Sequence, residues 1–100
     1  MGKFRFRNKA VLDLSAIWNY TFTNWSENQA DKYYRMLIET CQGLADNPNI
    51  GSSYPLIMAD LGGYRSGHHI VFYRKVKDDE IQIIRILHER MDLKNRLKQK

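Results

Sequence analysis

Hydrophobic residues at helical spacing predict two helices in the first half of the chain. After Asn8, which can cap a helix, apolar residues recur every three or four positions as far as Trp18. A longer stripe follows Ser26, which together with Gln29 has the spacing of a capping box. Asn47-Pro48 ends this second helix, because the residue before a proline disfavours helical backbone. The second stripe comprises Ala30, Tyr33, Tyr34, Leu37, Ile38, Cys41, Leu44 and Ala45.

Alternation of apolar and polar residues with period two predicts β-strands at both ends of the chain. The last of these strands is largely apolar on both faces, which is typical of a central strand, and strict alternation places Ile81, Ile83, Arg85 and Leu87 on one face. Residues 49–63 predict a long loop because they are rich in Gly, Ser and Pro. The predicted strands are residues 3–7, 63–66, 68–76 and 80–88.

This order of elements, β-α-α-β-β-β(-α), predicts an α+β fold. We expect a helical hairpin packed on one face of a largely antiparallel four-stranded sheet, within a single domain spanning residues 1–100. Residues 90–100 predict a short helix and a basic tail, with Met91 or Leu93 and Leu97 turned inward. The opposite face of the sheet is expected to stay partly open, as a surface for a partner.

Composition places the chain among ordinary globular proteins, with 43% hydrophobic and 27% charged residues. The lone Cys41 cannot form an internal disulfide, which fits a reducing cytoplasm. No apolar run approaches the roughly 20 residues of a membrane span, and the alternating N-terminus is unlike a secretory signal. We therefore expect a cytoplasmic protein without a membrane partner.

The net charge of +5 is unevenly distributed. Residues 1–9 contain four cations and no acid, and cations also prevail in 65–77 and 81–100, whereas residues 36–64 contain no Lys or Arg. Clustered charge of this kind creates a field that steers an anionic partner. The basic character therefore belongs to the predicted sheet and tail.

The second half of the chain resembles the C-terminal half of a ParE-type toxin of the RelE/ParE toxin–antitoxin superfamily. It contains an arginine preceded by glycine and two strands joined by an acidic turn, and the resemblance covers nearly the whole chain. One branch of this superfamily cuts messenger RNA on the ribosome and the other poisons DNA gyrase, so individual residues must decide between them. The residues that carry the resemblance are Arg65–Lys77, Ile81–Asp92, Gln29-Ala30, Tyr33, Leu37 and Leu44–Gly51.

Of the two activities, ribonuclease chemistry requires the most specific set of residues. Attack of a 2′-hydroxyl on its own phosphate needs a base, an acid and cations that stabilise the developing charge. In a nuclease, Arg65, Arg85 and His88 would carry this chemistry. The lysines that the nuclease branch places before Arg65, and its C-terminal tyrosine, are missing here. The sequence therefore favours the gyrase-inhibiting branch, with a ribosome-dependent endoribonuclease as the alternative.

Several of these residues also have structural interpretations. Arg85 lies among isoleucines, where an ion pair with Asp92 or Glu89 is the favoured role. His88 is interpreted as a hydrogen-bonded structural histidine. His68 and His69 should project to opposite faces of a strand, and no second histidine is expected to converge with His88, so no metal site is predicted. The aromatic residues Trp18, Trp25, Tyr33 and Tyr34 are expected to pack in the core or the hairpin.

The resemblance implies a toxin that binds gyrase, stabilises its cleaved-DNA complex and arrests growth, with no catalysis, no cofactor and at most indirect contact with DNA. For the target surface we expect Arg65, Arg74, His88, Arg90 and Met91, assisted by the tail 94–100. A non-toxic nucleic-acid-binding module is a third hypothesis, since Tyr64 and Tyr73 lie among cations.

The resemblance also implies a cognate ParD-like antitoxin, with a ribbon-helix-helix N-terminus and a C-terminal segment that is disordered until it binds. Such toxin–antitoxin pairs serve plasmid or chromosomal stability. The segment would follow the helical hairpin and reach the sheet, and its cations could meet Glu39 and Asp46. The expected antitoxin-binding residues are Tyr33, Leu37, Tyr64 and Tyr73.

Overall fold

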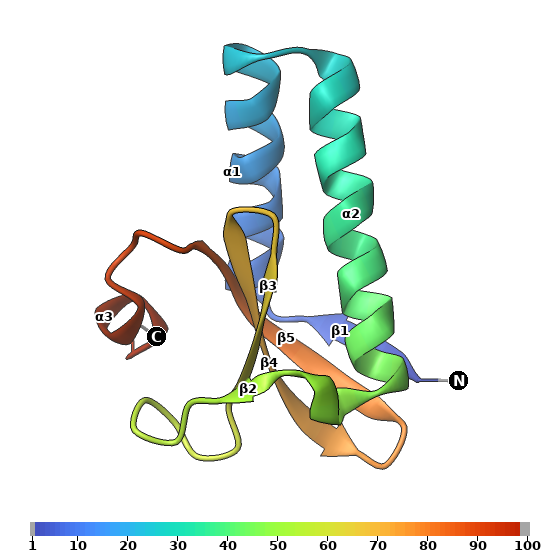
Figure 1. Cartoon of the computed structure of the whole chain (residues 1–100), viewed down its shortest axis with the longest axis vertical. Helices are drawn as coiled ribbons and strands as arrows, with labels where there is room; N and C mark the ends of the chain where they lie inside the picture. Colours follow the sequence, from blue (N-terminus) through green and yellow to red (C-terminus); the bar gives the residue numbers. More distant parts are fainter. Residues whose placement is uncertain (1, 99–100) are drawn as a thin grey trace.

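The computed structural model describes residues 2–98 and has two long helices packed against one face of a sheet (Figure 1). The predicted α+β class and order of elements are confirmed, but the sheet has five strands rather than four, because Ser52–Ser53 in the predicted loop pairs with the next strand. The elements are β1 (Lys3–Phe6), α1 (Asn8–Asn24), α2 (Glu27–Asp46), the 3₁₀ turn η1 (Pro48–Ile50), β2 (Ser52–Ser53), β3 (Gly62–Ser66), β4 (His69–Lys77), β5 (Glu80–His88) and α3 (Leu93–Lys98).

The strand order β1-β5-β4-β3-β2 places β5 inside the sheet, as its two apolar faces predicted. The first strand runs parallel to β5, with Phe4 opposite Ile81, and all other neighbouring strands are antiparallel. In the β4–β5 pair, His69 lies opposite His88. The chain therefore brings its first and last strands together. The last residues of β3 and β5 and the first residue of β4 meet at one end of the sheet.

Local signals explain most of the helix boundaries. The Ser26 hydroxyl accepts a hydrogen bond from the backbone N–H of Gln29 at 3.1 Å, which confirms the predicted cap of α2. This helix ends at Asp46, directly before Asn47-Pro48, as predicted. The predicted cap of α1 is wrong: Asn8 is already helical, and Arg7 at the cap position makes no side-chain cap.

The main hydrophobic core lies between the helical hairpin and the sheet. Leu37, Cys41 and Leu44 of α2 are fully buried against β4 and β5, and burial raises the pKa of the Cys41 thiol to about 12. The predicted stripe on α2 is thus confirmed at its centre, whereas Tyr34 at its edge is exposed. The expectation that Trp25 packs in the core or the hairpin is also wrong, since it is 75% exposed. The core cluster comprises Ala10, Leu14, Leu37, Cys41, Leu44, Ala45, Val71, Tyr73, Ile81, Ile83 and Ile86.

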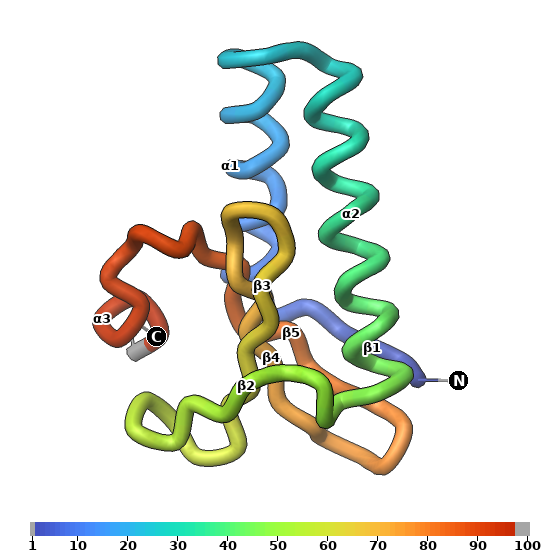
Figure 2. The backbone as a smooth tube through the Cα atoms, viewed as in Figure 1, coloured from blue at the N-terminus to red at the C-terminus, as the bar shows by residue number. Residues whose placement is uncertain are grey.

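The opposite face of the sheet, expected to be partly open, is covered around Phe72 and Leu87 and stays exposed toward Arg74 on β4. A second cluster forms there around Phe72 and Leu87, where the loop before β3 and the terminal helix α3 pack on the strands. In Figure 2 these two segments lie to the left of the sheet, away from α2. Leu93 and Leu97 turn inward as predicted, while Met91 is exposed. The buried members of this second cluster are Leu61, Phe72, Ile84, Leu87 and Leu97.

A β-bulge in β5 overturns the predicted alternation of its side chains. Phe72 lies opposite Arg85 and Tyr73 lies opposite Ile83, so Ile84 is an extra residue in β5. Beyond the bulge the two faces exchange, which places Ile86 with the helix-side core and Leu87 with the second cluster. Strict alternation had put both residues on the wrong face.

At the bulge Arg85 faces α1, and its guanidinium meets the carboxylate of Asp13. Arg85 Nε donates to Asp13 Oδ2 at 2.8 Å, and Nη2 donates to Oδ1 at 3.0 Å. The same carboxylate accepts the backbone N–H of Ile86 at 2.9 Å, and Arg85 Nη1 donates to the carbonyl of Arg96 at 3.1 Å. The predicted ion pair is confirmed, but its partner is Asp13 and neither Asp92 nor Glu89.

We predict that Asp13→Ala lowers the free energy of unfolding by about 3 kcal/mol, because it leaves the mostly buried Arg85 guanidinium and the Ile86 amide without their acceptor. Urea titration measures this as a lower midpoint with an unchanged slope. Glu39→Gln, at an exposed carboxylate of α2, should change stability by less than about 0.5 kcal/mol. Equal effects of the two substitutions would contradict a structural role for the pair.

Candidate functional site

The three histidines of the chain converge at one end of the sheet. His69 and His88 lie opposite each other on β4 and β5, with ring centroids 5.2 Å apart, and the rings of His68 and His88 stack at 6.2 Å. We call His68, His69 and His88 the histidine cluster. The expectation that no second histidine converges with His88 is therefore wrong, because the β4–β5 register decides which residue faces His88.

Tyr33 of α2 holds the turn between β3 and β4 in place. Its hydroxyl accepts the backbone N–H of His68 at 3.0 Å and shares a hydrogen bond of 2.6 Å with Nδ1 of His69. At the centre of this turn, Gly67 has a φ of 63°, and a Cβ there would lie 2.7 Å from the Tyr33 oxygen. The histidine cluster is therefore attached to the helical hairpin as well as to the sheet.

Burial controls the protonation of this pair. Desolvation lowers the pKa of His69 to about 4, and repulsion from His88 and His68 adds to the effect. Burial also raises the pKa of Tyr33 above its ordinary value of 10.0. Near neutral pH both side chains are therefore uncharged.

Arg65 of β3 lies beside the histidine cluster and pairs with Glu89. Arg65 Nη2 is 2.8 Å from Glu89 Oε2, but no N–H in the described part of the chain is aligned with that oxygen as a hydrogen bond, so the contact is electrostatic. Arg65 Nε donates to the carbonyl of Gly67 at 3.2 Å. Its side chain is 65% exposed, so the pair contributes little to stability and the guanidinium remains accessible to an anionic partner.

Four of the five residues predicted for the target surface meet at this end of the sheet. Arg90 and Met91 are exposed and follow β5 directly, next to His88 and Arg65. The backbone N–H of Arg90 donates to Nδ1 of His88 at 3.2 Å. Arg74 is separate from them, because it lies opposite Gln82 toward the other end of β4. The predicted tail contribution falls partly on residues 99–100, outside the described residues.

Two of the four residues predicted to bind the antitoxin are in the core. Leu37 is fully buried, and Tyr73 is buried with its hydroxyl bonded to the carbonyl of Pro48 and the N–H of Gly51. Leu37 therefore cannot contact a partner in this conformation, which corrects the expectation for it, whereas Tyr73 is 3% exposed and only lines a cavity with its ring. Tyr33 is half-buried in its contacts with the turn, and Tyr64 is exposed on β3.

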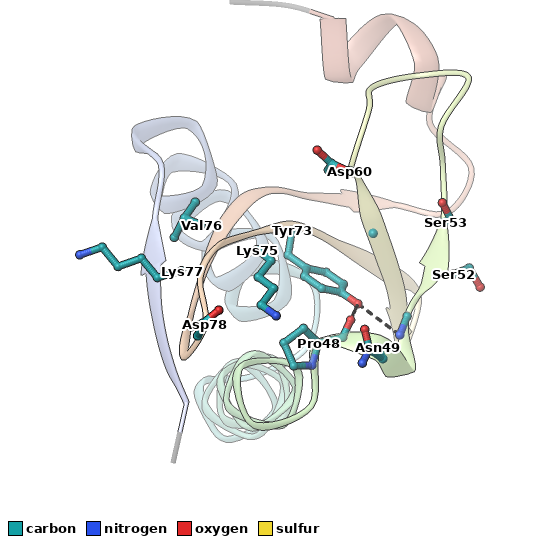
Figure 3. A pocket seen from close by; sticks show the side chains of 12 residues that line it. Pro48, Asn49, Ser52, Ser53, Asp60, Tyr73, Lys75, Val76, Lys77 and Asp78 are labelled. Atoms are coloured by element: carbon teal, nitrogen blue, oxygen red, sulfur yellow. Dashed lines mark hydrogen bonds between the residues drawn. The ribbon is translucent and has the colours of Figure 1, made fainter.

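An open cavity of about 570 Å³ lies below the other end of the sheet, between η1, β2 and the β4–β5 turn. Figure 3 shows the Tyr73 ring and Lys75 pointing into it, while Lys77 points away. Its lining combines the two lysines with Asp60 and Asp78, so its charge is nearly balanced. It offers no imidazole or cysteine, and the histidine cluster is therefore the stronger candidate site.

The site offers imidazoles, a phenol and cations on an accessible surface, which suits the binding of an anionic or polar macromolecular surface. Within residues 2–98, no group of three or more His, Cys, Asp or Glu side chains is arranged to hold a metal ion. Nor is any helix in the described range long and apolar enough to cross a bilayer.

We predict that His69 makes stability depend on pH between about 6.5 and 4. The unfolded ring titrates near 6.5 and the folded ring near 4, so as the pH falls the unfolded chain binds the proton first. The stabilising contribution of the neutral ring is complete above pH 6.5 and is lost as the pH approaches 4. Relative to His69→Gln, the loss should be on the order of 1–2 kcal/mol, after allowance for screening of the partly exposed ring.

Urea titrations of both proteins across this pH range measure the difference. His68→Gln, at an exposed ring, serves as the control and should keep most of the pH dependence, because desolvation of His69 is its main cause. A constant difference between wild type and His69→Gln from pH 7 to 4 would show that the fold does not hold His69 neutral.

Comparison with known proteins agrees with the fold and identifies the family. The family described as ParE toxin of type II toxin-antitoxin system, parDE, matches residues 4–93. Toxin ParE1 of Caulobacter vibrioides is 34% identical over 97 residues, which cover 97% of this chain and 99% of that protein. Toxin ParE1 of Mycobacterium tuberculosis is 34% identical over 88 residues, covering 88% of this chain and 90% of that protein.

A solved structure supports the same assignment. The structure described as a chromosomal ParDE TA system from P. aeruginosa superposes with a TM-score of 0.72 at 26% identity, covering 88% of this chain and 95% of that chain. The family match spans every strand of the sheet and both long helices, including the whole candidate site. The chain belongs to the ParE toxin family of type II toxin–antitoxin systems.

Proposed function

We propose that this toxin acts in the cytoplasm by binding DNA gyrase and stabilising its cleaved-DNA complex, without cleaving a bond itself. The observation that carries the proposal is the convergence of Arg65, His88 and Arg90 at an accessible end of the sheet, in a chain of the ParE family. Cations and imidazoles in this arrangement bind the polar surface of a large partner, and electrostatic attraction speeds their encounter.

The contacts of the candidate catalytic groups favour binding over catalysis. Arg85, the second cation that a nuclease would need, is held by Asp13 on the helix side and cannot also serve a phosphate. His69 is hydrogen-bonded to Tyr33, and its low pKa makes it a poor base near neutral pH. Nδ1 of His88 accepts the N–H of Arg90. The site thus offers groups that can recognise a partner, but most of the atoms that would transfer a proton are already engaged in hydrogen bonds within the protein.

A ParD-like antitoxin is the proposed second partner. Its ribbon-helix-helix N-terminus would bind DNA, and its C-terminal segment would order on the toxin. Support comes from the description of the P. aeruginosa structure as a ParDE system. On this chain, Tyr64 offers an exposed aromatic contact on β3, with the partly buried Tyr33 nearby across the β3–β4 turn. Exposed Glu39 and Asp46 would meet cations of the segment.

One observation favours a second candidate function, ribosome-dependent cleavage of messenger RNA. The rings of His68 and His88 stack 6.2 Å apart, so two imidazoles stand side by side where the sequence indicated one. One imidazole could accept the proton of the attacking 2′-hydroxyl, while the other protonates the 5′-oxygen released as its bond to phosphorus breaks. Arg65 would then stabilise the charge on the phosphate.

We predict that the purified toxin, added to gyrase, ATP and plasmid, traps cleaved DNA that appears as linear plasmid after the protein is denatured and digested. Arg65→Ala and Arg90→Ala should each raise the toxin concentration required by about tenfold, because each removes an accessible charged contact. Lys32→Ala, at an exposed cation of α2, is the matched control and should have no effect.

The same preparations added to translating ribosomes decide between the two candidates. Efficient cutting of the message that His88→Ala abolishes, with no trapped gyrase complex, would reject gyrase inhibition in favour of the nuclease.

For the antitoxin we predict that Tyr64→Ala weakens binding at least tenfold, because an exposed aromatic side chain would become buried in the complex. Apolar anchors should carry much of the affinity, so raising the salt from 0.1 to 0.5 M should weaken binding less than tenfold. Calorimetry with the antitoxin measures both effects. Tyr20→Ala, at an exposed tyrosine of α1 far from the sheet, is the control. If Tyr64→Ala binds the antitoxin with unchanged affinity, β3 is not part of the interface.

A further inference from the structure

Exposed cations gather on the face of the sheet that is turned away from the hairpin. On β1, Phe4 and Phe6 pack against the helix-side core, so the side chains that alternate with them point to the opposite face. On β4, Phe72 belongs to the second cluster, so Arg74, two positions later, points to the same face. The exposed cations are Lys3 and Arg5 of β1 and Arg74 and Lys77 of β4. We call these four residues the basic face.

The register of the sheet arranges the basic face in two rows across three neighbouring strands. Each β1 cation and its β4 counterpart lie opposite the same residue of β5, which is Gln82 for the two arginines and Glu80 for the two lysines. Residues opposite each other in neighbouring strands project from one face of a sheet. Val76 is an extra residue in β4, and this irregularity turns Lys77 to the face of the other three cations. In Figure 3, Lys77 accordingly points away from the cavity that Lys75 faces.

One carboxylate is enclosed within the basic face. The Glu80 side chain is 10% exposed, and its Oε2 lies 3.1 Å from Nε of Arg5, which itself stays 74% exposed. Glu80 therefore fixes the position of Arg5 and offsets one of the four positive charges. Exposed Asp78 and Asp79 border the lysine row at the β4–β5 turn, so the positive potential is strongest toward the arginine row.

The chemistry of the basic face identifies the class of partner. The aromatic residues of β1 and β4 pack in the two clusters, so this face offers neither an aromatic anchor for a protein interface nor a platform on which single-stranded bases stack. Arginine, lysine and the half-buried amide of Gln82 are suitable donors for phosphate oxygens. A phosphate backbone is therefore the ligand that these side chains fit.

The spacing of the two rows and of the two strands favours a duplex. Neighbouring strands are about 4.8 Å apart, so the cations of β1 and β4 start about 10 Å apart and can reach phosphates on both sides of a groove that is about 6 or 12 Å wide. Duplex DNA presents one negative charge per about 1.7 Å of its axis. An extended acidic peptide turns at most one carboxylate per about 6.7 Å toward the sheet, which is a much lower charge density.

We propose that the basic face binds the phosphate backbone of duplex DNA directly, without reading the bases. The inference goes beyond the proposed function, which concerns contacts with gyrase, and it replaces the indirect DNA contact that the family resemblance implied. In the complex with gyrase, the basic face contacts the DNA that the enzyme holds, while Arg65 and the histidine cluster contact the enzyme. Arg74 and His69 lie toward opposite ends of β4, so both surfaces can be engaged at once and the DNA contact adds to the total affinity.

The first test measures binding of the purified toxin to a fluorescent duplex of about 20 base pairs, by anisotropy, while the salt concentration is varied. Arg74→Ala/Lys77→Ala should weaken binding at least tenfold at about 0.1 M salt, and the slope of log K against log salt should become shallower by about 2, because two phosphate contacts are lost. A duplex of unrelated sequence should give the same affinities, because phosphate contacts carry no base information.

Two further variants serve as controls, and thermal unfolding confirms that each variant folds. Lys32→Ala/Arg35→Ala removes the same charge from exposed positions of α2 and should leave the slope unchanged and the affinity within about twofold of the wild type. Arg74→Lys/Lys77→Arg keeps the charges of the basic face and should bind like the wild type. Equal losses in the two double-alanine variants would show an effect of net charge alone and overturn the inference.

A second measurement locates the DNA within the gyrase complex. The native Cys41 is buried, so a thiol reagent labels a single cysteine introduced at the surface. Asp79→Cys, in the exposed turn beside the basic face, is labelled with an iron–EDTA reagent that cuts nearby DNA, and Glu39→Cys on α2 is the control. We expect cuts from position 79 and none from position 39. A labelled Asp79→Cys toxin that traps the gyrase complex without cutting the DNA would overturn the inference.

The outcomes separate the inference from the proposed function. If the toxin traps the gyrase complex but its DNA affinity does not depend on the basic face, the inference fails and the proposed function stands. DNA binding through the basic face without a trapped gyrase complex keeps the inference and rejects the proposed function. If Arg74→Ala/Lys77→Ala loses binding to phosphatidylglycerol vesicles or to the antitoxin while its DNA affinity is unchanged, the basic face belongs to that partner and the inference is overturned.

Discussion

A mostly buried ion pair between Asp13 and Arg85 joins the first helix to a central strand and the terminal helix. The pair forms where the β-bulge leaves Ile86 with an amide that turns toward α1, and one carboxylate satisfies both that amide and the guanidinium. Arg85 also donates to the last helix through the carbonyl of Arg96. An unpaired charge at this position would cost several kcal/mol, so helix, bulge and α3 depend on one another.

The bulge also decides how the two faces of the sheet are filled. By exchanging the faces of β5 it supplies Ile86 to the core beneath the hairpin and Leu87 to the cluster beneath α3 and the loop. Most of both faces of the sheet is therefore covered, and the surface left for partners is β1 with the exposed half of β4, the ends of the sheet and the hairpin. This explains why the contacts of the candidate site are at the turn and strand ends, with Arg65 and His88.

Two tyrosines anchor the ends of the sheet to the helical layer and to its exit loop. Tyr33 holds the β3–β4 turn through His68 and His69, and Tyr73 holds η1 and the start of β2 through Pro48 and Gly51. Each hydroxyl forms hydrogen bonds with backbone groups of a loop that would otherwise have to bond to water. The histidine cluster is consequently a rigid feature, which suits recognition of a large partner without further ordering.

Local sequence determined the helices, four of the five strands and the central place of β5, because periodicity, the Ser26 cap and Asn47-Pro48 act within a few residues. Residue types also indicated the family and made Arg65 and His88 candidate site residues. Local sequence could not predict contacts between distant segments. Asp13 and Arg85 are separated by 72 positions, and His69 meets His88 only through the register of the strands. Nor could it predict that Leu37 and Tyr73 are buried. Register, the bulge and exposure are properties of the assembled layers, since each depends on which strands pair and what packs over them, and only the tertiary structure decided them.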